Sequence, residues 1–122
     1  MDPPQLPSTG SDTGPEVLDD AFLALRDRTR RYVCYFLLEH GTASLSEVAD
    51  VITGWIHATD GGIVEPQCRT NQYSNLVHTH VPRLVETGVV RHDEETETLS
   101  LDSCPELVRD VIARACEAET GT

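Results

Sequence analysis

The chain has 122 residues, with 21 aspartates and glutamates against nine arginines and no lysine, and a net charge of −12. This length suits one domain with a single core, and no segment reaches the roughly 18 apolar residues of a membrane span. The amino terminus is acidic and lacks the regions of a signal peptide, so we expect a cytoplasmic protein without a membrane segment.

The acidic composition is typical of a halophilic protein. A surface rich in carboxylates and free of lysine is tolerated in concentrated salt, where repulsion is screened within about 3 Å at 1 M. An apolar content of 39% with clear periodicity argues against a disordered acidic segment. The composition therefore predicts a folded protein adapted to salt.

The chain begins with a leader and two predicted helices. Residues 1–15 contain four prolines and two glycines, which predicts a disordered leader. Apolar residues recur at helical spacing from residue 16 onward, which predicts a first helix. Asp27 can cap the start of a second helix, and Gly41 suits its end.

A third and a fourth helix are predicted in the middle of the chain. Ser44 and Glu47 form a capping box at the start of the third helix, and the sequence TDGG at residues 59–62 ends it. The fourth helix begins at residues 67–70 and ends at Gly88, which can adopt the left-handed conformation that other residues resist.

Two β-rich runs and a last helix complete the chain. Residues 89–90 and 96–101 favour strands, and a turn at residues 92–95 joins them, which predicts a β-hairpin. The sequence SCPE at residues 103–106 matches a second capping box. It opens a last helix within residues 104–118.

The apolar sides of these elements predict one shared core. We expect the following residues to be buried together: Phe22, Leu25, Val33, Phe36, Leu37, Val48, Ile52, Trp55, Leu76, Leu84, Val90 and Leu99.

Three segments resemble families of winged-helix proteins. Residues 80–90, HVPRLVETGVV, resemble the pattern H-L-x-x-L-x-x-A-G-L-V of ArsR-type repressors. Residues 24–31, ALRDRTRR, and residues 36–41, FLLEHG, resemble the A-L-x-D-x-T-R and L-L-x-x-G elements that open the same family. The wording THVPRL and GVV within residues 79–90 is closer still to a haloarchaeal winged helix-turn-helix domain family of unknown function.

The resemblance implies a mainly α fold with a small β-hairpin. It implies a winged helix-turn-helix domain over residues 16–103, with four helices and a hairpin wing, followed by a packing or dimerisation helix at residues 104–118. In such folds the recognition helix enters the major groove of double-stranded DNA. The chain is therefore expected to be a homodimeric, DNA-binding transcriptional regulator of a halophilic archaeon. The alternative is a winged-helix protein-interaction module without DNA affinity.

The outward face of the fourth helix and the base of the wing carry the candidate DNA contacts. Asn and Gln can pair with adenine and Arg with guanine, while Arg also binds phosphate. The candidates are Arg69, Asn71, Gln72, Asn75, His78, Thr79, Arg83 and Arg91. A solvated helix face is polar in any protein, so the interpretation depends on the winged-helix resemblance.

The predicted wing tip is acidic. Residues 93–97 include four carboxylates, and only Arg91 and His92 stand at the base of the tip. A DNA-binding wing usually offers Arg or Lys to phosphates. We therefore expect the tip either to be held away from the DNA backbone or to face a protein partner.

Pro82 departs from the ArsR-type pattern. It cannot donate to the carbonyl of His78 and disfavours helical geometry at Val81, at a cost of about 3 kcal/mol in a regular helix. We expect a kink there. The kink either divides a base-facing front half, residues 67–79, from a packing rear half, residues 83–87, or only relieves a crowded junction.

No metal site, cofactor or catalytic activity is expected. Cys68, His78 and His80 invite a metal, but histidines two residues apart on a helix point about 200° from each other. The four cysteines form no C-x-x-C pair and are expected to be free thiols. The chain also has no glycine-rich phosphate loop and no nucleophile motif, so it is not expected to be an enzyme.

The last helix is the candidate dimer surface. Leu107, Val108, Val111 and Ile112 form an apolar stripe that can pair with a second copy, together with the first helix. The alternative is that this stripe packs on the chain's own core.

Overall fold

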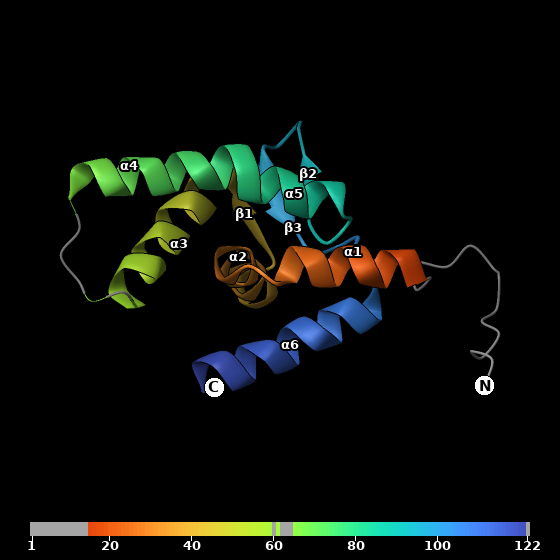
Figure 1. The fold of residues 1–122 in the computed structure, drawn as a ribbon. Coiled ribbons are helices and arrows are strands. Elements are labelled where there is room, and N and C mark those ends of the chain that lie inside the picture. Colours follow the sequence, from red (N-terminus) through yellow and green to blue (C-terminus); the bar gives the residue numbers. More distant parts are fainter. Residues whose placement is uncertain (1–14, 60, 62–64, 122) are drawn as a thin grey trace.

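The computed structural model describes residues 15–59, 61 and 65–121. The predicted leader, residues 1–15, lies outside this range except for Pro15. Within the described range the chain is mainly helical and carries a small three-stranded antiparallel sheet (Figure 1). None of the helices described is both long and apolar enough to cross a membrane.

The elements follow the predicted order, with one additional strand. The helices are α1 Pro15–Leu25, α2 Arg28–His40, α3 Leu45–Thr59, α4 Pro66–Asn75, the π-helix η1 Leu76–His80, α5 Val81–Glu86 and α6 Glu106–Thr120. The strands are β1 Thr42–Ser44, β2 Arg91–Asp93 and β3 Thr98–Ser100, in the sheet order β1-β3-β2.

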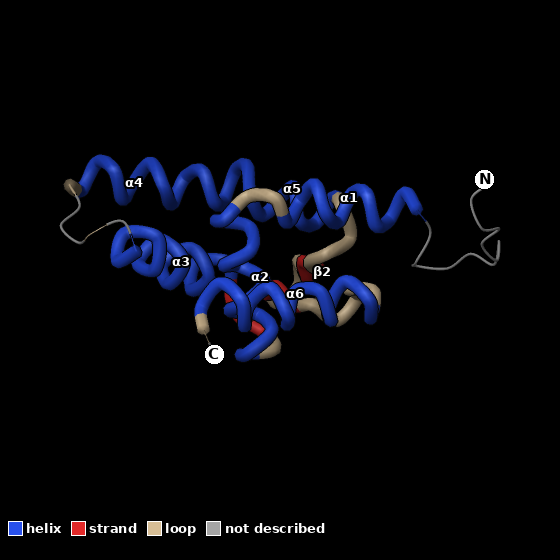
Figure 2. The backbone as a smooth tube through the Cα atoms, turned by 60° about the horizontal axis from the view of Figure 1, so that its bottom comes forward, coloured by secondary structure: helices blue, strands red, loops and turns tan. Residues whose placement is uncertain are grey.

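Two helical layers enclose the core. Figures 1 and 2 show α4, η1 and α5 following one another along one edge of the molecule, while α6 lies on the opposite side of α2. The helix α3 packs between α2 and α4, and the sheet lies against α2. The long α4–α5 edge is therefore separated from α6 by the body of the protein.

The predicted caps of α2 and α3 are confirmed. The carboxylate of Asp27 accepts a hydrogen bond of 3.1 Å from the backbone N–H of Arg30. At the other end, Gly41 adopts a φ of 82° and its N–H donates to the carbonyl of Leu37. The N–H of Glu47 donates to the hydroxyl of Ser44 at 3.1 Å.

The second predicted capping box is wrong. The helix α6 begins at Glu106, and its N-cap is Pro105, whose side chain makes no capping hydrogen bond. Proline at this position is extended, with ψ of 143°, so Ser103 lies too far before the helix to cap it. The N–H of Cys104 instead donates to the carbonyl of Leu101 in a turn.

Most of the predicted core is buried as expected, with two exceptions. The buried members are Leu25, Val33, Phe36, Leu37, Val48, Ile52, Leu76, Leu84, Val90 and Leu99. Phe22 is 50% exposed and Trp55 is 37% exposed, so their assignment to the core is corrected. The two side chains are exposed for different reasons. Phe22 lies off the side of α1 that is buried, which carries Ala21 and Ala24. Trp55 places only part of its ring against Tyr32 and Phe36.

A π-helical turn occupies the junction before Pro82. The N–H of Val81 donates to the carbonyl of Leu76, five residues earlier. In an α-helix, residues five apart point about 140° from each other. The wider turn lets both side chains enter the core, where they are 0% and 5% exposed.

The regular helix is therefore interrupted just before Pro82 by this wider turn, and the kink itself stays a prediction. Pro82 stands in the first turn of α5, where a helix tolerates a residue without an N–H. The front segment α4 has no buried residue, whereas α5 buries Val81 and Leu84. The predicted front half, residues 67–79, is therefore largely exposed but buries Leu76, and the rear half, residues 83–87, packs through Leu84.

The hairpin is confirmed, but its turn lies two residues later than predicted. The strand β2 begins at Arg91, and the connecting turn is residues 94–97 instead of 92–95. Val89 and Val90 are not in the strand, because their N–H groups both donate to the carbonyl of Leu84 and so complete the end of α5. Gly88 has a φ of 80°, which permits this exit.

Candidate nucleic-acid interface

The helix α4 extends its side chains into solvent along its whole length. No residue of α4 is buried, although Gln72 and Tyr73 are partly covered. Pro66 at its start supplies the fixed φ that favours a first helical turn. Anchorage comes from the next segment, where Leu76 is 0% exposed. The core thus holds the carboxyl-terminal end of α4, through Leu76 and the partly buried Tyr73, and leaves its first turns available for contact.

The structure brings most of the predicted DNA contacts onto this helix and its continuation. Exposed members are Arg69, Asn71, Asn75, His78, Thr79, Arg83 and Arg91, and Gln72 is half-buried. All but Arg91 lie on α4, η1 or α5. Arg91 opens the strand β2, opposite Ser100 of β3.

Weak contacts along the helix orient several of these polar side chains. The amide of Gln67 donates to the side-chain oxygen of Asn71 at 3.2 Å. The hydroxyl of Thr79 donates to the side-chain oxygen of Asn75 at 3.4 Å. Arg83 lies 3.9 Å from Glu86 in an exposed ion pair. Exposed contacts of this kind contribute little to stability, so a ligand can replace them at low cost.

The charge of this helix differs from that of the rest of the chain. Residues 66–85 contain no aspartate or glutamate, in a protein with 21 of them among 122 residues. The same stretch carries Arg69, Arg83, His78 and His80. It is the longest run without a carboxylate in the sequence, and it coincides with α4, η1 and nearly all of α5.

The tip of the β2–β3 hairpin is stabilised by its own acidic residues. The carboxylate of Asp93 accepts hydrogen bonds from the N–H groups of Glu95 and Thr96, at 3.0 and 3.4 Å. Glu97 adopts a left-handed φ of 55°, and its carboxylate lies 3.5 Å from His92. Glu94, Glu95 and Glu97 are exposed. The tip is therefore an ordered, negatively charged turn.

His78 and His80 face different surroundings. His78 is exposed, whereas the side chain of His80 is only 12% exposed and its Nδ1 lies 3.8 Å from the carboxylate of Asp27. Burial lowers the pKa of His80, although Asp27 opposes the shift. His80 therefore belongs to the packing between η1 and the start of α2.

A family model described as a domain of unknown function, DUF7344, matches residues 22–100. This match covers well over half of the chain. The chain belongs to the DUF7344 family. No curated protein and no solved structure gives a significant match.

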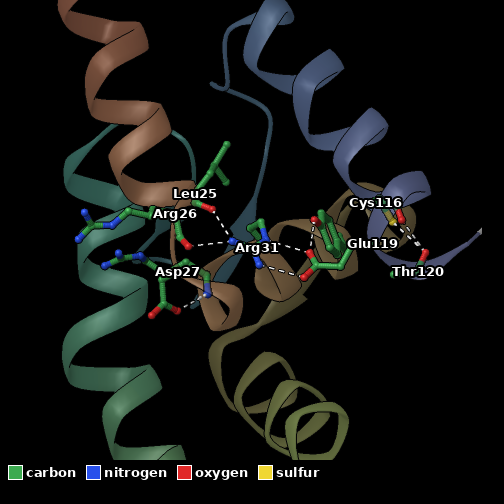
Figure 3. Close-up of polar contacts among 9 residues, drawn as sticks. Leu25, Arg26, Asp27, Arg31, Cys116, Glu119 and Thr120 are labelled. Carbon is green, nitrogen blue, oxygen red and sulfur yellow. Dashed lines mark hydrogen bonds and ion pairs between the residues drawn. The ribbon is translucent and has the colours of Figure 1, made fainter. Parts of the chain in front are cut away.

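The DUF7344 match ends within β3, so α6 lies beyond it. A polar cluster nevertheless ties α6 to the domain, as Figure 3 shows. Arg31 donates to both carboxylate oxygens of Glu119, at 2.8 and 2.9 Å, and to the carbonyls of Leu25 and Arg26 at the end of α1. The hydroxyl of Tyr35 donates to Glu119 at 2.7 Å.

This cluster was not predicted from the sequence. Its members are 88 residues apart in the chain, and no local pattern pairs them. Hydrogen bonding to Arg31 lowers the pKa of Glu119, and burial together with Glu119 raises the pKa of Tyr35. Three helices, α1, α2 and α6, are thereby joined through one guanidinium group.

The three residues that invite a metal in the sequence, Cys68, His78 and His80, do not come together. Cys68 is exposed near the start of α4, and His78 and His80 face different sides. Within the part of the chain that the structure describes, no group of three or more His, Cys, Asp or Glu side chains could hold a metal ion. All four cysteines are free thiols, as predicted.

Proposed function

We propose that this chain is a cytoplasmic DNA-binding transcriptional regulator of a halophilic archaeon, with a winged helix-turn-helix fold. In this proposal α4 and η1 enter the major groove, and the hairpin β2–β3 is the wing. The protein acts as a homodimer. This proposal extends the resemblance to ArsR-type repressors to the DUF7344 family.

One observation carries the proposal: the most exposed helix is also the longest carboxylate-free stretch of the chain. Phosphate contacts dominate the affinity of DNA-binding proteins. A helix with carboxylates among its outward residues would be repelled by the DNA backbone. The absence of acidic residues from 66–85, in a chain with net charge −12, favours a polyanion as the partner of this surface.

The order of elements also supports the proposal. The helices α3 and α4 are consecutive and in contact, and an antiparallel hairpin follows α5. The short strand β1 pairs with β3 across the registers Thr42–Ser100 and Ser44–Thr98. This pairing attaches the hairpin to the start of α3, so the hairpin and α4 keep a fixed relation.

The second candidate function is a protein-interaction module. The acidic tip of the hairpin favours it, since Glu94, Glu95 and Glu97 are exposed where a DNA-binding wing offers basic side chains. A basic protein surface is the complementary partner for such a tip.

The deciding experiment is selection of genomic DNA fragments by the purified protein in molar KCl, read by sequencing. We expect enrichment of specific fragments. Asn71→Ala or Asn75→Ala should cost about 1–3 kcal/mol on the selected site and much less on random DNA. If no fragment is enriched at any salt concentration, the regulator function is rejected.

A matched pair of arginine variants separates site-specific from general charge effects. Arg83→Ala should weaken binding to all sequences and lower the salt dependence by about one counterion. Arg114→Ala removes the same charge from an exposed position on α6, on the other side of the molecule. It should leave DNA affinity nearly unchanged. Equal effects of both variants would contradict contact through α5.

A double variant at the tip of the hairpin tests the second candidate. Glu94→Gln with Glu95→Gln removes two exposed charges and keeps Asp93, which orders the turn. Stronger non-specific DNA binding would place the tip near the phosphates. Unchanged DNA binding together with loss of a protein pull-down would favour the interaction module.

A further inference from the structure

A hollow of about 360 Å³ lies between α2, α3 and α6, and none of its lining residues belongs to the proposed DNA surface. Its lining residues are Tyr32, Tyr35, Glu39, Trp55, Ala58, Thr59, Cys116 and Thr120. Small-molecule sites in proteins usually have volumes of this order. The proposed contact with DNA does not account for this hollow.

Three aromatic rings form much of its wall. The ring centroids of Tyr32 and Tyr35 are 6.0 Å apart, and those of Tyr32 and Trp55 are 6.2 Å apart in an edge-on arrangement. Trp55 is 37% exposed although its ring also contacts Phe36. The rings therefore contact one another at tilted and edge-on angles, and Trp55 is the most exposed of the three.

The electrostatic character of the hollow is negative. Among the residues that the structure describes, Glu39 is the only charged side chain in its lining. The last turns of α2, α3 and α6 all contribute lining residues, and Figures 1 and 2 show the ends of α3 and α6 on the same side of the molecule. Helix C-termini carry partial negative charge that favours cations. The last turn of α6 contains no basic residue, whereas those of α2 and α3 each contain a histidine, His40 and His57.

Two arginines near the hollow are engaged by other groups and do not line it. Arg31 is engaged by both oxygens of Glu119 at the edge of the cluster described above. Arg28 lies over the Tyr32 ring at 6.0 Å from its centroid, outside the lining of the hollow. Arg28 therefore already occupies one face of the Tyr32 ring.

We propose that this hollow binds a small organic cation of the quaternary ammonium class. Such a cation cannot donate hydrogen bonds and is held by aromatic faces and by diffuse negative charge. The rings of Tyr32, Tyr35 and Trp55 supply the faces, and Glu39 with the three helix ends supplies the charge. The site is independent of the proposed DNA binding.

The test uses choline as the probe and dimethylbutanol, its neutral carbon isostere, as the control ligand. Trp55 is the only tryptophan of the chain, so its fluorescence reports on the hollow alone. Titrations are made at constant ionic strength in KCl. We expect a saturable change with choline, with a dissociation constant on the order of 1 mM, and binding of the isostere weaker by about tenfold.

Two variants with the same change of charge identify the site. Glu39→Gln removes the carboxylate of the hollow and should weaken choline binding about threefold or more. Glu94→Gln removes an exposed carboxylate from the tip of the hairpin and should leave choline binding unchanged. The proposal is overturned if choline gives no saturable change, if the neutral isostere binds as tightly, or if both variants have equal effects.

Discussion

Arg31 is the residue on which three helices of this small protein depend. Its guanidinium contacts the carbonyls of Leu25 and Arg26, which end α1, and both carboxylate oxygens of Glu119 on α6 (Figure 3). The guanidinium group of Arg31 offers several N–H donors in a fixed plane, so it can bind both oxygens of the Glu119 carboxylate at once. Such a bidentate pair fixes the orientation of the two groups as well as their distance. The side chains of Arg31 and Glu119 are 26% and 27% exposed, so solvent screens the pair only in part.

Replacing Glu119 should make the protein less sensitive to acid. Arg31 lowers the pKa of the Glu119 carboxyl in the folded chain below its ordinary value of 4.5. Its contribution to stability is therefore complete above pH 4.5 and is lost as pH falls through the lowered value. Glu119→Gln should cost about 1 kcal/mol at neutral pH, after allowance for exposure, and much less at acid pH.

Denaturant unfolding at several pH values, in constant salt, measures this difference. Glu117→Gln is the matched control, because it removes a carboxylate from the same helix at an exposed position. A loss of stability that is equal for both variants, or independent of pH, would show that the Arg31–Glu119 pair contributes nothing specific.

The π-turn η1 shows how the spacing of buried residues decides the form of a helix. Leu76 and Val81 are five residues apart and both are buried, whereas a regular α-helix would turn these two positions about 140° from each other. The π-turn contains one residue more than an α-helical turn, and it keeps the side chains of Leu76 and Val81 on the side of the helix that faces the core. Pro82 follows at once, where its missing N–H does least harm.

Deleting Thr79 should therefore convert the segment to a regular helix, provided that Pro82 is also replaced. The deletion places Leu76 and Val81 four apart, which is the spacing of one α-helical face. The deletion alone leaves a proline inside a regular helix and should cost about 3 kcal/mol or more. Combined with Pro82→Ala it should fold with nearly wild-type stability.

Circular dichroism and chemical denaturation measure both variants. Pro82→Ala alone is the control for the loss of proline. If the deletion is equally destabilising with and without Pro82→Ala, the five-residue spacing is not what maintains the π-turn.

At the scale of elements, the sequence predicted most of what periodicity and capping determine. The limits of α2 followed from Asp27 and Gly41, whose local hydrogen bonds need no tertiary partner. The strand β1 was missed because Thr42–Ser44 has no strong pattern, and it is a strand through pairing with β3. Val89 and Val90 favour strands by propensity, but their N–H groups complete α5.

The candidate site was less predictable in some parts than in others. The helical pattern placed Asn71 and Asn75 outward, and both are exposed. Phe22 and Trp55 lie on apolar stripes like the true core residues, yet both remain partly exposed. A stripe shows that a side chain has an apolar side, but the number of neighbours that cover it depends on the packing of distant elements.

The whole molecule carries a large negative charge with few cations to balance it. Its 21 carboxylates are opposed by nine arginines, and several of these arginines are engaged in fixed contacts, as Arg31 and Arg109 show. Self-repulsion in the compact state therefore increases as salt is removed.

Folding should weaken as KCl is lowered from molar concentration to about 0.05 M. Thermal melting followed by circular dichroism measures the change, and choline-free buffers avoid occupancy of the proposed cation site. A neutral osmolyte at matched osmolarity is the control for solvent exclusion. A melting temperature that does not change across this range would contradict the inference of a halophilic protein.

The dimer surface must be redefined from the buried positions of α6. Val108 and Ile112 are each 1% exposed and belong to the chain's own core, so they are removed from the candidate interface. Leu107 is 46% exposed, and Val111 is half-buried beside a hollow of about 700 Å³ between α1, α2 and α6. Truncation of α6 would therefore test core packing and dimerisation together.

The charges of α1 favour a second copy as the partner of this surface. Phe22 and Leu23 are both 50% exposed at the middle of the segment, with Asp19 before them and Arg26 after them. Asp19 and Arg26 both line the same hollow. A two-fold axis between Phe22 and Leu23 would place Asp19 of one copy opposite Arg26 of the other. The apolar centre of one copy then faces the apolar centre of the other, and each Asp19 faces an Arg26, so the surface is complementary to a second copy of itself.

Phe22→Asp should accordingly convert a dimer to a monomer while leaving the fold intact, because half of this side chain is exposed in the single chain. Light scattering in molar KCl measures the mass, and circular dichroism confirms the helical content. Ala58→Asp is the control, since it adds the same charge at an exposed position on α3 and should leave the dimer unchanged. Asp19→Arg should also dissociate the dimer, and Asp19→Arg combined with Arg26→Asp should restore it, because the exchanged charges again face each other across the axis. A wild-type protein that is already monomeric at high micromolar concentration would exclude the self-complementary surface.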